Sequence, residues 1–170
     1  IVSLNYSDCY TDMMLDFSIN YNRNQIVNVN ENYFHHKSNA YKRRDEGNDG
    51  KNILALHMIQ RVLKSGIYVD YLLVDSWYAK PNFINEVKEN GLNVIARIAN
   101  NPRIWQFVGK HNTLESLYTQ AKKQKTSKFG NYNTIKYTYI STIATHKTLG
   151  RIKIVFIKTT KSEQAMLVRK

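Results

Sequence analysis

The sequence predicts an α/β protein with a β-rich module, and three observations support this fold class. Two segments with helical periodicity alternate with two apolar, β-branched segments between residues 51 and 98, and the connections are short. This order is typical of right-handed crossovers and a parallel sheet. After residue 102 the chain changes to alternating polar and apolar residues, which is typical of antiparallel strands. Only 2 Pro and 7 Gly in 170 residues favour regular elements.

The first element is a predicted β-hairpin over residues 1–20. Apolar and polar residues alternate in 1–6 and again in 14–19, and the turn-forming segment 7–12 separates these two runs. The polar segment 35–50 follows, with the basic cluster Lys42-Arg43-Arg44 and no apolar stripe.

The central element is an apolar strand that ends in a carboxylate. A helix is predicted over 51–65, and Gly66 ends it. Residues 67–74 are nearly all apolar, which predicts a strand buried on both faces in the middle of a parallel sheet. Asp75 follows directly, and Ser76-Trp77-Tyr78 comes next.

A second helix–strand unit repeats this order. Pro81 and Gly91 mark the ends of the helix, and residues 92–98 form the next strand, with Arg97 near its end. Open α/β sheets bind ligands at the carboxyl ends of their strands, so Asp75 and Arg97 are candidate site residues. The alternative is that Asp75 only starts a turn or caps the following helix.

The β-rich module is expected to follow residue 101. It contains a short strand at 104–108, a short helix capped by Thr113, two strands over 133–145 and 151–158, and a last strand at 165–168. We therefore divide the chain into an α/β core (1–101), a basic β-rich module (102–160) and a return strand to the core (161–170).

The positive charge is concentrated in this module. The net charge is +12, and residues 102–170 contain fourteen Lys and Arg against two Glu, so the rest of the chain is neutral overall. This asymmetry predicts a polyanionic partner, most often nucleic acid, although a solvated basic surface is the alternative. The sequence shows no signal peptide, bilayer-spanning apolar run, Gly-rich phosphate loop or Gly-x-Ser-x-Gly motif, and the scattered histidines do not predict a zinc site.

An ordered set of motifs resembles the bacterial insertion-sequence DDE transposases of the insertion-sequence-four type. The set covers nearly the whole chain, and its members are Met14-Leu15-Asp16-Phe17-Ser18, Lys42-Arg43-Arg44, Lys51, Gly66-Ile67, Tyr71-Leu72-Leu73-Val74-Asp75-Ser76-Trp77-Tyr78, Pro81, Gly91-Leu92-Asn93-Val94-Ile95-Ala96-Arg97, Arg151 to Phe156 and Ala165-Met166-Leu167-Val168.

The resemblance implies an RNase H-like mixed sheet with flanking helices and a mostly antiparallel β insertion. It also implies phosphodiester hydrolysis and strand transfer at transposon ends, with three acids and two Mg²⁺ ions. Asp75 matches the second acid. The resemblance places the first acid before Ile1 and the third after residue 170, so this segment alone is expected to be inactive. Asp8, Asp12 and Asp16 could substitute for the first acid, but they lie in or beside the hairpin turn, where acids usually only favour the turn. Glu115 and Glu163 do not match the third acid.

The resemblance and the charge pattern together suggest DNA contacts, for which the candidates are Arg43, Arg44, Lys51, Arg97, Lys122, Lys123, Lys125 and Lys128. Pairing with Asp45, Glu46 and Asp49 is the alternative for the first three. Trp77 and Trp105 could form a channel wall or stack a base, and core packing is the alternative for both.

The expected partners are transposon-end and target DNA, with a homodimer in the full-length protein and no membrane. The expected location is the bacterial cytoplasm, in association with the nucleoid. Two other functions fit the same sequence: a nucleic-acid-binding module without chemistry, and an RNase H-like nuclease that cleaves without joining strands.

Overall fold

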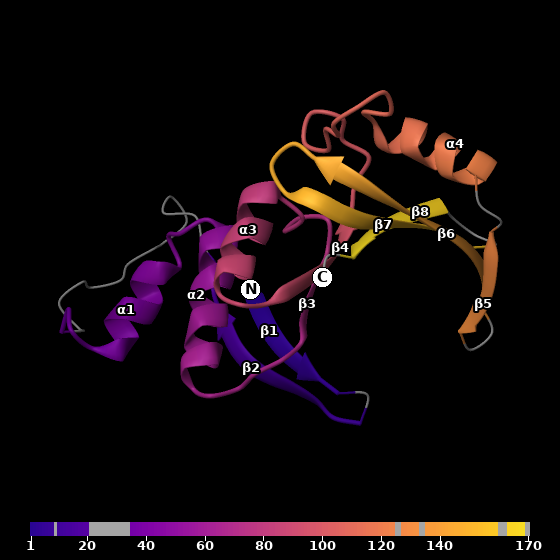
Figure 1. The fold of residues 1–170 in the computed structure, drawn as a ribbon. Coiled ribbons are helices and arrows are strands. Elements are labelled where there is room, and N and C mark those ends of the chain that lie inside the picture. Colours follow the sequence, from indigo (N-terminus) through magenta and orange to yellow (C-terminus); the bar gives the residue numbers. More distant parts are fainter. Residues whose placement is uncertain (9, 21–34, 125–126, 133–134, 160–162, 169–170) are drawn as a thin grey trace. The chain divides into compact units, whose positions relative to one another are not determined.

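The computed structural model describes residues 1–8, 10–20, 35–124, 127–132, 135–159 and 163–168, with the side chains of 132, 135 and 163–168 excepted. The chain forms two compact units, Ile1–Tyr68 and Val69–Lys170 (Figure 1). The fold is mixed α/β with an antiparallel β module, as the sequence predicted. Within the described parts of the chain, no helix is both long enough and apolar enough to cross a membrane.

The first unit contains the predicted hairpin, in which β1 (Val2–Ser7) and β2 (Asp12–Ser18) pair antiparallel. Asp8 closes its turn, because its Oδ1 accepts hydrogen bonds from the backbone N–H groups of Tyr10 (3.0 Å) and Thr11 (2.7 Å). These backbone hydrogen bonds lower the pKa of the Asp8 carboxyl below its ordinary value. Asp8 is thus a turn-forming acid.

Helix α2 (Lys51–Lys64) contacts both strands of the hairpin and confirms the predicted helix. A shorter helix, α1 (Asn39–Glu46), lies in the polar segment where no helix was predicted. It has no fully buried residue, so it carries no apolar stripe. Its start is instead marked by Ser38, whose Oγ accepts a hydrogen bond from the N–H of Tyr41 at 3.2 Å.

The second unit is built on a six-stranded sheet with the order β3-β4-β8-β7-β6-β5. Strands β3 (Tyr71–Val74) and β4 (Asn93–Ile98) are parallel, as predicted. Helix α3 (Pro81–Glu89) joins them and packs on β4 through Phe83, Ile84 and Val87, all buried. This pair positions Asp75 and Arg97.

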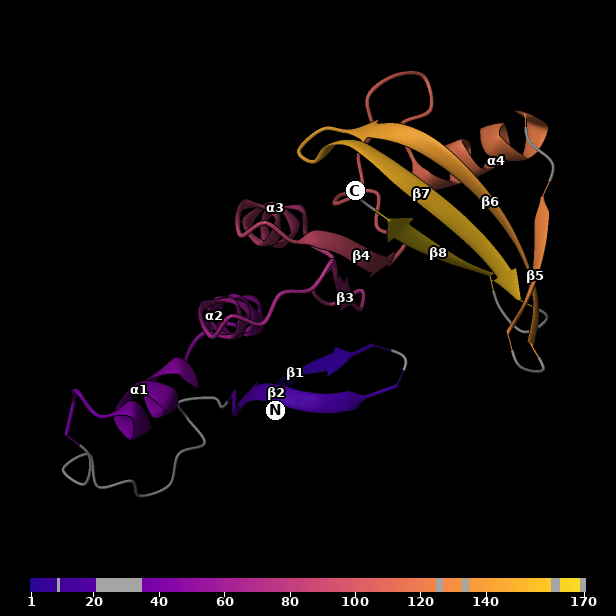
Figure 2. The same ribbon diagram turned by 60° about the horizontal axis from the view of Figure 1, so that its bottom comes forward.

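The other four strands are antiparallel: β5 (Lys128–Tyr132), β6 (Ile135–His146), β7 (Gly150–Thr159) and β8 (Glu163–Val168). Strand β8 lies between β4 and β7 and pairs antiparallel with both (Figure 2). The return strand therefore joins the parallel pair and the β module into one sheet. Helix α4 (Leu114–Gln124) packs against β6.

Three expectations differ from the structure. Strand β3 begins at Tyr71 and lies at the edge of its sheet with Leu73 71% exposed, so it is not buried on both faces in mid-sheet. Residues 104–108 form no strand beyond an isolated bridge between Phe107 and His146. Strand β5 was not predicted, because its exposed, Lys-containing sequence lacks the alternation of a half-buried strand.

Candidate functional site

Asp75 lies directly after β3, at the carboxyl end of the parallel β3–β4 pair, and it is exposed. Its Oδ1 accepts a hydrogen bond from the backbone N–H of Trp77 at 2.9 Å. This local bond fixes the carboxylate at the start of the turn that leads to α3, as the turn-forming alternative expected. The bond does not exclude a second role, because a carboxylate offers about four acceptor positions on its two oxygens.

Two aromatic residues follow Asp75 and differ in their surroundings. Trp77 is 58% exposed, and the Nζ atom of Lys80 lies 5.9 Å from the centre of its ring. Tyr78 packs against Phe83 of α3 with ring centroids 5.8 Å apart. Burial, together with the negative charge of Asp75, raises the pKa of the Tyr78 hydroxyl. Tyr78 therefore anchors the turn, and Trp77 presents an indole to solvent two residues from Asp75.

Arg97 lies at the same end of the strand pair as Asp75. The parallel register aligns Val74 with Ala96, which puts Arg97 one residue further along β4. Arg97 is exposed, as Asp75 is. An exposed carboxylate can bind a cation and an exposed guanidinium can bind a phosphate, so the carboxyl ends of β3 and β4 are the candidate site.

The described residues do not make a two-metal site around Asp75. No group of three or more His, Cys, Asp or Glu side chains in the described ranges could hold a metal ion. Hard divalent cations take several oxygen ligands, and Asp75 supplies a single carboxylate. The donor set of the described residues therefore does not fit two bound metal ions.

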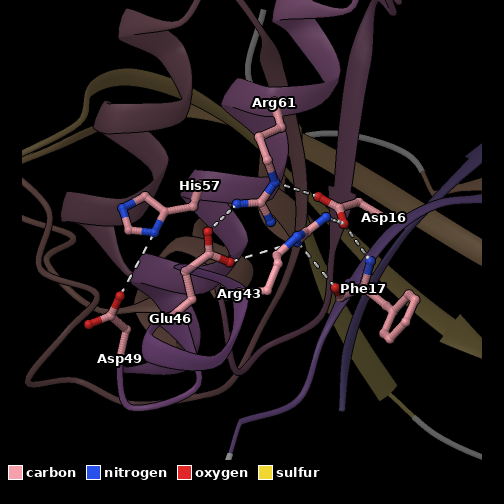
Figure 3. Close-up of polar contacts among 7 residues, drawn as sticks. All are labelled: Asp16, Phe17, Arg43, Glu46, Asp49, His57 and Arg61. Atoms are coloured by element: carbon pink, nitrogen blue, oxygen red, sulfur yellow. Dashed lines mark hydrogen bonds and ion pairs between the residues drawn. The ribbon is translucent and has the colours of Figure 1, made fainter. Parts of the chain in front are cut away.

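The first unit contains a cluster of four charged side chains, Asp16, Arg43, Glu46 and Arg61 (Figure 3). Asp16 is only 7% exposed. Its Oδ1 accepts from Nη2 of Arg43 at 2.7 Å, and its Oδ2 accepts from Nε of Arg61 at 2.9 Å. Nη1 of Arg61 also donates to Oε1 of Glu46 at 2.6 Å. The cluster ties strand β2 to helices α1 and α2.

Two opposing effects set the ionisation of Asp16. Burial alone raises its pKa, because it disfavours the charged form. Hydrogen bonds and the positive charges of Arg43 and Arg61 outweigh burial, so the pKa of the Asp16 carboxyl is lowered below its ordinary value. Asp16 is an ionised structural residue of the first unit.

The cluster bears on the predicted DNA contacts of the basic segment. Arg43 carries the ion pair with Asp16, and its Nη1 lies 3.7 Å from Oε2 of Glu46. The structure therefore contains the pairing of Arg43 with Glu46 that was the alternative to a DNA contact. The shorter ion pair of Arg43 with Asp16 was not predicted. Arg44 lies on α1, and Lys51 is the first residue of α2 and is exposed.

The predicted basic tract is split between two elements. Lys122 and Lys123 are exposed in the last turn of α4, and Lys128 is exposed at the start of β5. Lys125 lies outside the described residues. The three described lysines belong to the second unit, as Arg97 does.

Trp105 is 2% exposed and packs edge-on against His146, with ring centroids 5.3 Å apart. His146 is also buried, and its Nδ1 accepts from the N–H groups of Thr148 (3.1 Å) and Leu149 (3.2 Å). Its Nε2 lies 3.0 Å from the carbonyl oxygen of Ile104 and donates to it. In this arrangement Trp105 belongs to a core that fixes the loop before α4, and a base has no access to its ring.

A cavity of about 530 Å³ opens between α4 and the sheet. The residues that line it include Tyr118, Phe156, Arg97, Lys158 and Glu115. Its lining therefore contains charged residues of both signs, with Arg97 and Lys158 as cations and Glu115 as an anion.

The fold is a mixed α/β domain with an antiparallel β module, which is consistent with an RNase H-like DDE domain. The sequence pattern of the family described as DDE superfamily endonuclease matches residues 13–149, and the chain belongs to this family. The match includes Asp16, Asp75 and Arg97. No curated protein matches the chain. Membership indicates a function of the transposase or nuclease type, with DNA as substrate.

Proposed function

We propose that residues 1–170 are the central part of the catalytic core of a bacterial insertion-sequence DDE transposase of the insertion-sequence-four type. The complete protein hydrolyses a phosphodiester at the transposon end and then joins the freed 3′-hydroxyl to target DNA. The observation that carries this proposal is Asp75, an exposed carboxylate at the carboxyl end of β3 within the matched family region.

Asp75 is proposed as one of three acids, and the other two belong to parts of the protein outside residues 1–170. In the complete protein the three acids would hold Mg²⁺, and the metal would supply charge stabilisation to the attacking and leaving oxygens. Since the described residues do not fit a two-metal site, we assign no catalytic step to them alone. Residues 1–170 are proposed to be inactive in isolation.

Two of the candidate DNA contacts lie beside Asp75: Trp77 follows it by two residues, and Arg97 lies at the same end of the β3–β4 pair. Arg97 would bind a phosphate at the end of β4, and Trp77 would form a wall of the DNA channel. Arg44, Lys51, Lys122, Lys123, Lys125 and Lys128 would position the DNA backbone without reading its sequence. Arg43 would need to exchange its pairing with Asp16 to do the same. We further propose a homodimer in the bacterial cytoplasm, associated with the nucleoid.

The test compares residues 1–170 with a longer protein from the same reading frame. Purified residues 1–170 are incubated with supercoiled plasmid and Mg²⁺, and no nicking above background is expected. A longer protein from the same reading frame, with the flanking acids, is expected to nick DNA that carries the transposon ends. Its Asp75→Asn variant is expected to lose this nicking while keeping DNA binding. Nicking by residues 1–170 that disappears in Asp75→Asn contradicts the proposed inactivity.

A hydrolytic nuclease of the same fold is the second candidate, because the matched family is described as endonucleases. Both candidates cleave DNA, but only a transposase joins the new 3′ end to a second molecule. Pre-cleaved end DNA and a target plasmid separate them, since covalent end–target products form only if the protein catalyses strand transfer. A longer protein that binds DNA but neither nicks nor joins it refutes both candidates.

A further inference from the structure

The strands β5, β6 and β7 contain no Asp or Glu and five Lys or Arg residues. Burial alternates along β7: Ile152 and Ile154 are buried, whereas Arg151 and Lys153 between them are exposed. One face of the sheet therefore packs into the core, and the opposite face carries Arg151 and Lys153. We refer to this opposite face of β5–β7 as the basic face.

Two tyrosines of β6 lie on the basic face. Tyr137 and Tyr139 are two residues apart on one strand, so they point to the same side, and their ring centroids are 6.3 Å apart. Tyr139 pairs with Lys128 on β5 and with Ile157 on β7. Directly opposed residues of antiparallel strands share a face, so Lys128 lies beside Tyr139.

The ring of Tyr137 packs against a neighbouring strand. It pairs with Gly130 of β5, and a Cβ atom at position 130 would overlap the Tyr137 ring. The ring thus lies across the backbone of Gly130, which holds it against the sheet. Both tyrosines are half-buried, so each is only partly accessible to solvent.

We infer that the basic face binds single-stranded DNA, with bases stacked on Tyr137 and Tyr139 and phosphates bound by Lys128, Arg151 and Lys153. Aromatic rings on a sheet surrounded by cations suit a single strand, because its bases are free to stack, whereas a duplex keeps them paired. The absence of acids from these strands means that no carboxylate of β5–β7 repels the phosphates. The choice of DNA rests on the family; the face itself needs neither Asp75 nor a metal.

The test measures the binding of residues 1–170 to a labelled 20-nucleotide single strand, and to its duplex, by fluorescence anisotropy. Stacking contributes roughly 1–3 kcal/mol per base, so the double variant Tyr137→Ala/Tyr139→Ala, which removes two rings, is expected to raise Kd for the single strand by about 30-fold or more. Its Kd for the duplex should change less than about 3-fold, since paired bases do not reach the rings. The double Tyr→Phe variant keeps both rings and should bind as the wild type does.

A matched control and a charge variant complete the design. Tyr10, a 98% exposed tyrosine of the first unit, is changed to Ala and should leave both Kd values unaltered. The variant Lys128→Gln/Lys153→Gln should weaken both complexes and reduce the salt slope for the single strand by about 0.7 per lost phosphate contact.

Several outcomes overturn the inference. One is an equal loss of single-strand and duplex binding in the double Tyr→Ala variant, and another is no loss in either. Tighter binding of an RNA strand of the same sequence excludes DNA as the preferred occupant. If the double variant does not fold, Tyr139→Leu keeps an apolar side chain without the ring and gives the same comparison. The assay involves no cleavage, so its failure and the failure of the proposed transposase activity are separate results.

Discussion

The replacement Asp16→Asn tests whether the charged cluster holds the first unit together. Asn keeps the size of the side chain and removes its negative charge. Arg43 and Arg61 then face Glu46 as the only carboxylate of the cluster, and the side chain at position 16 no longer accepts two charge-assisted hydrogen bonds.

The expected loss follows from the exposure of the two arginines. The Arg61 side chain is 32% exposed and donates to a carboxylate that is almost buried, whereas the Arg43 side chain is 44% exposed. A hydrogen bond to a charged group contributes about 1.5–3 kcal/mol, and a solvent-exposed ion pair contributes under about 1 kcal/mol. We therefore expect about 1.5–2 kcal/mol from Arg61 and about 0.5–1 kcal/mol from Arg43, which is about 2–3 kcal/mol in total.

Hydrogen exchange monitored by mass spectrometry measures this loss of stability locally, because the exchange of the amides of each unit is followed separately. Where exchange reports the opening equilibrium, a loss of about 2–3 kcal/mol makes the amides of β2 and α2 exchange roughly 30- to 150-fold faster. The amides of β6 and β7, in the second unit, serve as an internal reference and should not change. Asp12→Asn, at an exposed position on the same strand, is the matched control and should stay within about 0.5 kcal/mol of the wild type.

The pH dependence of the same measurement has a defined sign. Because the pKa of Asp16 is lowered on folding, its contribution is fully present above the unfolded-state pKa of about 3.9 and is lost as pH falls through the folded-state pKa. The difference between wild type and Asp16→Asn should be constant from about pH 7 to 5 and shrink below about pH 4. A difference under about 0.5 kcal/mol at pH 7, or one that is unchanged at pH 3.5, refutes the role assigned to the cluster.

Two further predictions concern single contacts. His146→Ala leaves the N–H groups of Thr148 and Leu149 without their acceptor and should lower the free energy of unfolding by about 3–4 kcal/mol. In a Trp77→Phe background, this loss should appear as a red shift of Trp105 emission and a lower urea midpoint. Unchanged emission and an unchanged midpoint would contradict the prediction. Ser38→Ala removes the cap of α1 and should destabilise the helix by about 1 kcal/mol, so the α1 amides should exchange about 5-fold faster. Ser38→Asp should restore the wild-type exchange rate. Equal rates in all three proteins would show that the cap is not needed.

The sequence predicted those elements whose burial is periodic. Helix α2 presents a stripe of buried residues at helical spacing, and strand β7 alternates buried and exposed positions, so each left its period in the sequence. The Pro and Gly at the ends of α3 marked its limits in the same direct way. The parallel pairing of β3 with β4 then followed from the order of elements and the short joins between them.

The failures have physical causes that local patterns do not contain. Trp105 and Phe107 alternate like a strand, but both are buried because they pack around His146, which lies about forty residues further along the chain. Strand β3 has apolar residues on both faces, which predicted burial on both, yet Leu73 is exposed because β3 lies at the edge of its sheet. The partners of Asp16 are 27 and 45 residues away, so its pairing depends on the tertiary fold.

The difference between local sequence patterns and tertiary contacts also changes how the net charge is interpreted. The cluster Lys42-Arg43-Arg44 is the densest basic run of the first unit, yet Arg43 is paired with Asp16 there. Strands β5–β7 contain no acid, and three of their five cations, Lys128, Arg151 and Lys153, share a face with two tyrosine rings. Since a phosphate must displace an existing carboxylate at Arg43 but not a carboxylate of these strands, the electrostatic argument for DNA applies more strongly to the second unit. Counting charges along the sequence locates the basic region, and only the pairing of each charge shows which part of it is open to a polyanion.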